Sequence, residues 1–225
     1  MTPEMIAQTQ PLRVNWHDAS WQKALAEALL HECTVEALGE TREGDTWRVT
    51  DEYNDPATVT WSADGMACDC GGPAPCPHMA RVWCHFMGSW DELEQVAWAH
   101  GIDAAVRLLV WQETGFLDRT PIRQLRPVTL RRIDGRPTVD VPVWKKFSLT
   151  GIEWGYYGAG PYDLAYSILT YFYGPAVGET FAEVFKREVI ARIPRDVSEH
   201  VITPEVIREA VDDRPCRYAA GGGAQ

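Results

Sequence analysis

The sequence predicts an α+β fold built from two small structured regions. Residues 46–50 and 57–61 are rich in Thr, Val and Trp, which favours short strands. After His78, apolar residues recur at helical spacing. A second strand pair is expected at residues 128–133 and 138–144, and further helical patterns follow it. We therefore expect a small ββα unit packed among helices, then a second α+β domain with a β-hairpin and three helices.

Length and composition are those of an ordinary soluble globular protein. The chain has 225 residues, of which 45% are hydrophobic and 24% charged, enough for one or two domains. The first five residues are polar and include an acid, unlike a signal peptide. The longest apolar run, Leu164 to Tyr173, is too short to span a bilayer. We expect a cytoplasmic protein without a membrane partner.

Residues 1–44 are expected to form an N-terminal arm and a helix. Asp18 or Ser20 is a suitable N-cap, and apolar residues lie on or near one stripe as far as Leu38. Gly39 would end this helix.

The most informative segment is Cys68 to His78, with the spacing C-x-C-x5-C-x-H. Three Cys and one His complete a tetrahedral ligand set for structural zinc. Gly and Pro fill the gaps and favour a stiff, turning loop. The alternatives are ordinary buried thiols with a surface histidine, or a disulfide, which a reducing cytosol disfavours.

This ligand pattern resembles the SWIM-type zinc finger. The flanking order of two strands, ligands, loop, ligands and helix also agrees with that family, over roughly residues 45–88. The resemblance implies that Zn²⁺ is bound and that the finger mediates protein or nucleic-acid binding. It assigns as metal ligands Cys68, Cys70, Cys76 and His78.

Two helices are expected to complete the finger domain, which we place at residues 45–115. Ser89 and Glu92 form a capping box that opens the first helix, and the second runs over about 102–112. A linker with Pro121 and several Arg residues then occupies 116–126.

A second motif, Gly151-Ile-Glu-Trp-Gly-Tyr-Tyr-Gly-Ala-Gly-Pro161, begins a different region. Together with the Asp-Leu-Ala that follows, it resembles an uncharacterised domain family of bacteria and phages over about residues 125–212. This resemblance implies a bacterial or phage accessory protein but no activity. We place the second domain at 127–212 and expect residues 213–225 to be a disordered tail.

Two interpretations of this motif remain open. A Gly-rich turn before a helix can bind an anion, and aromatic rings can stack on a base, so the loop 153–161 is a candidate site of a nucleotide-binding protein or enzyme. Alternatively it is a structural turn whose aromatics fill the core, which we favour because no nucleophile–base pair or paired carboxylates accompany it. The candidate ligand-binding residues are Glu153, Trp154, Tyr156, Gly158 and Gly160, whose glycines we expect to adopt conformations closed to other residues.

Charge is unevenly distributed along the chain. The formal net charge is −11, yet residues 119–146 contain eight basic and only two acidic residues. Such a segment can bind nucleic acid, or it can be a solvated face balanced by acids elsewhere. The overall acidity favours a protein partner, and the sequence leaves the oligomeric state undetermined. The candidate nucleic-acid contacts are Arg126, Arg131, Arg132, Lys145 and Lys146.

Overall fold

The structure, a computed structural model, describes residues 12–41, 44–51 and 56–212. It divides into an N-terminal unit, residues 1–114, and a C-terminal unit, residues 115–225. Both units combine helices with a small antiparallel sheet, which confirms the predicted α+β class. None of the described helices is long and apolar enough to cross a membrane. The first eleven residues of the expected N-terminal arm, and the expected tail at 213–225, lie outside the described residues.

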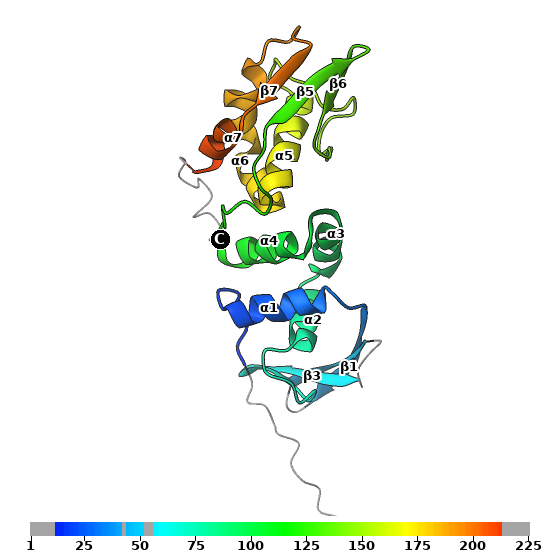
Figure 1. Cartoon of the computed structure of the whole chain (residues 1–225). Helices are drawn as coiled ribbons and strands as arrows, with labels where there is room; N and C mark the ends of the chain where they lie inside the picture. The colour runs from blue at the N-terminus through cyan, green and yellow to red at the C-terminus, as the bar shows by residue number, and fades with distance from the viewer. Residues whose placement is uncertain (1–11, 42–43, 52–55, 213–225) are drawn as a thin grey trace, which may run out of the picture. The chain divides into compact units, whose positions relative to one another are not determined.

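The N-terminal unit contains a four-stranded antiparallel sheet whose strands follow one another in sequence order. Helix α2 packs on this sheet and against α1, and α3 packs against α4 (Figure 1). Its strands are β1 (Cys33–Thr41), β2 (Gly44–Asp51), β3 (Ala57–Ser62) and β4 (Gly65–Cys68). Its helices are α1 (Ala19–Ala28), α2 (Pro77–Phe86), α3 (Trp90–His100) and α4 (Ile102–Thr114).

Large aromatic rings fill the core of the N-terminal unit. The Trp16 ring contacts the rings of Trp21 and Trp83 edge to face, with centroid distances of 5.5 and 5.0 Å. All three side chains are buried, and Leu25 and Val59 beside them are wholly inaccessible to solvent. This core joins the sheet to α1 and α2 and so gives the following Cys/His segment a rigid base.

The predicted helix from Ser20 to Leu38 is wrong in its second half. Helix α1 begins after the N-cap Asp18, whose carboxylate accepts a hydrogen bond from the Ser20 N–H at 2.8 Å, and it ends at Ala28. Residues 33–41 form β1 instead, paired antiparallel with β2. Strand pairing satisfies the backbone groups of both strands, and this tertiary gain overrides the local apolar stripe. Leu30 and Leu38, expected on the buried side, are exposed.

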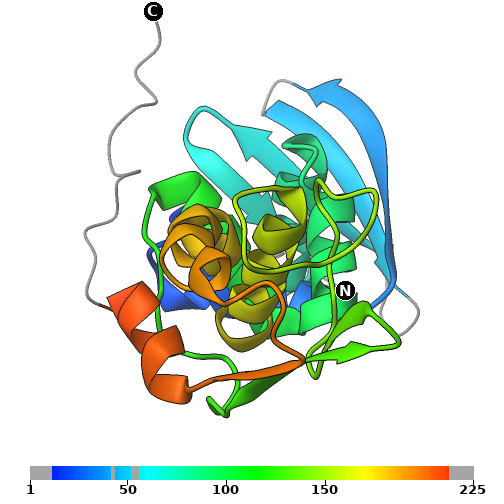
Figure 2. The same cartoon turned by 90° about the horizontal axis from the view of Figure 1, so that it is seen from above.

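The C-terminal unit pairs a three-stranded antiparallel sheet, in the order β6-β5-β7, with helices α5 and α6, which pack against each other. The strands run along one side of these helices (Figure 2). Its elements are β5 (Val128–Ile133), β6 (Arg136–Val139), α5 (Ala159–Tyr173), α6 (Pro175–Glu188), a 3-10 turn (Ile190–Arg192), β7 (Glu199–Ile202) and α7 (Pro204–Asp212).

The predicted β-hairpin is present, with two differences in its surroundings. Asp134 and Gly135 form the turn, both with positive φ, as a tight two-residue hairpin requires. The second strand stops at Val139 rather than Trp144. The Asp140 N–H still donates to the Thr129 carbonyl at 3.3 Å, but the Thr129 N–H is accepted by the Asp140 carboxylate, at 3.1 Å, instead of by a backbone carbonyl. Strand β7, which pairs with β5, was not predicted.

A buried carboxylate holds the segment between β6 and α5. Asp163 on α5 is wholly inaccessible and accepts backbone N–H groups of Lys146, Phe147 and Ser148 at 2.9–3.1 Å. One turn further on, the Ser167 hydroxyl accepts the Trp144 N–H at 2.9 Å. The Asp of the Asp-Leu-Ala sequence therefore orders a loop that has no secondary structure of its own.

Replacing this carboxylate should unfold the loop before the rest of the unit. Asp163→Asn is expected to lower the free energy of unfolding by about 2–4 kcal/mol, because a neutral amide has one acceptor oxygen where the carboxylate uses two to accept three backbone N–H groups. Urea unfolding followed by circular dichroism measures this loss. Asp196→Asn, at an exposed position, is the control and should change stability little. Equal stability of the two variants would contradict the role given to Asp163.

Ionisation of Tyr173 is expected to lower the stability of the C-terminal unit at alkaline pH. Burial raises the pKa of its phenol from 10.0 to about 12. The folded state thus keeps the proton where the unfolded state ionises, so stability is full below pH 10 and falls as pH rises from about 10 to 12. Tyr173→Phe should flatten this decline, because no phenol remains to ionise. Unfolding midpoints measured between pH 8 and 12 test it, and an unchanged decline would contradict it.

Candidate metal centre

Two secondary structure elements and the loop between them bring four donor atoms together. Cys68 is the last residue of β4, and Cys70 lies two residues beyond it in the loop. Cys76 is the N-cap of α2 with an extended backbone, Pro77 takes the first helical position and His78 the second. The end of a strand and the start of a helix therefore face each other across a short loop.

The distances suit one metal ion. The four ligand atoms of Cys68, Cys70, Cys76 and His78 all lie within 4.8 Å of one another. The Nδ1 atom of His78 is 3.8 Å from the Cys68 Sγ and 3.9 Å from the Cys76 Sγ. In a tetrahedral zinc site, S and N donors lie about 3.6 Å apart and S donors about 3.8 Å apart. The four residues thus form a group that can hold a metal ion.

Protonation of the cluster follows from the same proximity. A hydrogen bond with Cys68 lowers the pKa of the Cys76 thiol to about 4, and that contact together with burial raises the pKa of Cys68. The hydrogen bond with Cys76 raises the pKa of His78. Of the three clustered thiols, Cys76 is therefore the one that loses its proton most readily, since the pKa values of Cys68 and Cys70 are raised. A bound cation favours loss of the remaining protons, since each ligand binds metal in its deprotonated form.

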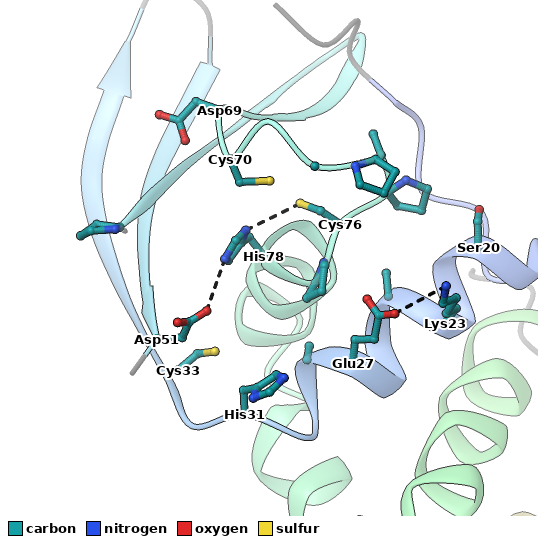
Figure 3. A pocket seen from close by; sticks show the side chains of 18 residues that line it. Ser20, Lys23, Glu27, His31, Cys33, Asp51, Asp69, Cys70, Cys76 and His78 are labelled. Atoms are coloured by element: carbon teal, nitrogen blue, oxygen red, sulfur yellow. Dashed lines mark hydrogen bonds and ion pairs between the residues drawn. The ribbon is translucent and has the colours of Figure 1, made fainter. Parts of the chain in front are cut away.

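Asp51 was not foreseen in the sequence, yet it adjoins the cluster. Its Oδ2 lies 3.8 Å from Nε2 of His78, and both side chains are mostly buried (Figure 3). The negative charge favours the tautomer with the proton on Nε2, which leaves Nδ1 free to face the sulfurs. Asp51 is the last residue of β2 and lies 27 positions before His78 in the chain, so no local sequence pattern predicts their contact.

A neighbouring acid anchors the loop to the sheet. The Asp69 carboxylate, between the first two cysteines, accepts the Thr58 N–H at 2.6 Å, and its own N–H donates to the Thr58 carbonyl at 3.2 Å. Cys68 is buried and Cys70 exposed, so the centre lies at the margin of the core rather than inside it. Cys33 and Cys84 are not part of the group.

The residues considered for nucleic-acid binding mostly have acidic neighbours. Arg126 pairs with Asp140 at 2.8 Å and Arg131 with Glu199 at 2.9 Å. Further pairs join Arg132 to Glu153, at 2.6 Å, and Lys146 to Glu179. Lys145 is exposed. Four of the five candidate side chains are thus paired with carboxylates within the fold.

Three side chains of the Gly-rich aromatic loop contact other parts of the C-terminal unit. Trp154 is wholly buried, and the guanidinium of Arg132 lies 4.3 Å from the centre of its ring. Glu153 is engaged by that same Arg132. The Tyr156 ring lies 5.1 Å from the guanidinium of Arg195. These contacts favour the structural interpretation of the loop.

The expected role of the two glycines in that loop needs correction. Gly158 has an extended backbone with φ of −173°, which any residue adopts, and Gly160 lies within α5. Gly160 is needed for space, since an added Cβ would stand 2.9 Å from the Glu153 Cβ. The left-handed conformation occurs at Gly155, with φ of +82°.

Residues 123–213 match a family of unknown function (DUF6166). This range nearly coincides with the second resemblance stated for the sequence, and it covers the C-terminal unit only. No family matched the segment that resembles a SWIM-type finger. Neither the curated proteins nor the solved structures compared with the chain gave a match. The cluster therefore has to be interpreted from its geometry.

Asp51 offers a direct test of the centre. Asp51→Asn should weaken metal binding by about 10- to 100-fold, because the histidine loses the charge that fixes its tautomer. Competition with a chromophoric chelator measures the affinity. Asp64→Asn, at an exposed turn in the same unit, is the control and should bind as the unchanged chain does. Equal affinities of all three proteins would exclude Asp51 from the centre.

Proposed function

We propose that the N-terminal unit is a zinc-stabilised interaction module of the SWIM type whose partner is a protein. The observation that carries the metal assignment is the convergence of three sulfurs and one ring nitrogen within 4.8 Å. Soft thiolates with one imidazole select zinc over hard cations such as Mg²⁺ and Ca²⁺.

The proposed centre is structural. Four protein ligands fill a tetrahedral shell, so no position remains for a substrate or for an activated water. Bound zinc would join the end of β4 to the start of α2 and contribute folding free energy to a unit with a modest core. The residues that would hold it are the ones that the family resemblance assigns.

Charge supports a protein rather than a nucleic-acid partner. Residues 1–114 contain 18 acidic and only 6 basic residues. A field of that sign repels phosphate backbones. In the C-terminal unit the candidate arginines are already paired with carboxylates.

Metal content tests this proposal. Purified protein is expected to carry about one zinc per chain by elemental analysis, and cobalt substitution should give a thiolate charge-transfer band. Cys76→Ser should abolish stoichiometric binding, because it removes the ligand between the loop and α2. Cys33→Ser, outside the cluster, is the matched control and should retain the metal. Full zinc content in Cys76→Ser, or none in the unchanged protein, would contradict the assignment.

A further inference from the structure

A cleft of about 810 Å³ opens beside the metal centre. One wall is the face of α1 that carries Lys23 and Glu27, and the other is the loop that carries Cys70 and Cys76 (Figure 3). Asp51 and His78 also line it. The cleft thus shares residues with the centre without using the metal's coordination positions.

The loop wall of this cleft is apolar. It is formed by Pro73, Ala74, Pro75 and Pro77, of which Pro73 and Ala74 are exposed. Proline has no N–H to donate. The α1 wall is polar and carries Ser20, Lys23 and Glu27. The loop wall accepts aliphatic side chains or methylene stems and offers little to a planar polar ligand.

The rim of the cleft is acidic. Carboxylates of Glu27, Asp51 and Asp69 line it, against the single ammonium of Lys23, which pairs with Glu27 at 3.7 Å. The Asp51 side chain is mostly buried beside His78, and Asp69 also accepts the Thr58 N–H. A filled site of three thiolates, one imidazole and Zn²⁺ adds one further negative charge. The whole N-terminal unit has the same sign, with 18 acidic and 6 basic residues.

The length of the α1 wall of the cleft favours an extended peptide as the ligand. Ser20 and Ala28, both at the α1 wall, are eight residues apart, which is about 12 Å along a helix axis. An extended peptide covers that length with about four residues. Lysine and arginine suit the site best, since their stems pack on the apolar loop wall while their charges reach the carboxylates.

We propose that this cleft binds a basic, extended segment of a partner protein. The inference rests on the proposed role of the unit as an interaction module and names the chemistry of its partner. Complementary charge draws the segment to the cleft, and contact of its aliphatic stems with Ala74 and the prolines of the loop holds it there. A nucleic acid would meet the same carboxylates with like charge.

Three fluorescent probes test the proposal on the full chain: a peptide of about nine residues that alternates Lys with Val, the same peptide with Glu for Lys, and a single-stranded oligonucleotide. Anisotropy should show the basic peptide binding at least about tenfold tighter than the other two, and weakening with salt. Equal binding of the two peptides, or preference for the oligonucleotide, would overturn it.

Two charged residues of α1, the exposed Lys23 and the half-buried Glu27, test whether the peptide binds in the cleft. Glu27→Lys should weaken the basic peptide by about three- to tenfold, and Lys23→Glu should strengthen it by a similar factor. Glu94→Lys changes the net charge as Glu27→Lys does but lies on α3 away from the cleft, so it should have a much smaller effect. If Glu27→Lys and Glu94→Lys had equal effects, the peptide would be bound by general charge attraction, and the cleft would not be its binding site.

Zinc content is measured in the same samples, so the two proposals fail separately. Full zinc without discrimination between the peptides overturns the docking cleft alone. A protein without zinc overturns the metal assignment whatever the peptides do, and the response to Glu27→Lys and Lys23→Glu still decides whether the cleft binds the basic peptide.

Discussion

The N-terminal unit depends on the meeting of four donor atoms where β4 ends and α2 begins. The residues just outside the cluster belong to the core: Met66 and Met79 are almost wholly buried. Their packing positions strand and helix, and the loop between them then has to return its cysteines to one point. Asp69 assists by fixing that loop to β3. The donors are therefore held by ordinary packing and hydrogen bonding, which prepares the site for a cation.

The sequence predicts this arrangement well because its determinants are local. Ligand spacing, the proline after Cys76 and the apolar period after His78 all lie within a few residues of one another. Strand β1 and the acid Asp51 were missed for the opposite reason. Residues 33–41 become a strand only because β2 offers them a pairing edge, and Asp51 meets His78 only after the sheet and α2 have packed. Neither relation leaves a short-range pattern in the chain.

The C-terminal unit shows the same division between local and distant determinants. The hairpin at Asp134 and Gly135 is readable from its turn residues. The charge balance of the basic segment cannot be predicted from neighbouring residues, because Glu199, the acid that pairs with Arg131, lies 68 positions further along the chain. Counting charges in a segment thus overstated its free positive charge. Trp154, considered as a stacking platform, is instead a core residue.

The proposed closed metal shell and the acidic composition of the N-terminal unit both support a binding role rather than a catalytic one. Under the proposed zinc assignment, four protein ligands fill the coordination shell, so the proposed binding activity resides in the protein surface around the centre. That surface is strongly negative, whereas the C-terminal unit has 14 acidic and 15 basic residues and is close to neutral. We therefore assign the proposed attraction of a cationic partner to the N-terminal unit. The carboxylates of Asp51 and Asp69 connect the proposed metal centre with the proposed binding cleft, because both line the cleft. Asp51 adjoins His78 of the Cys/His cluster, and Asp69 anchors the loop that carries the cysteines.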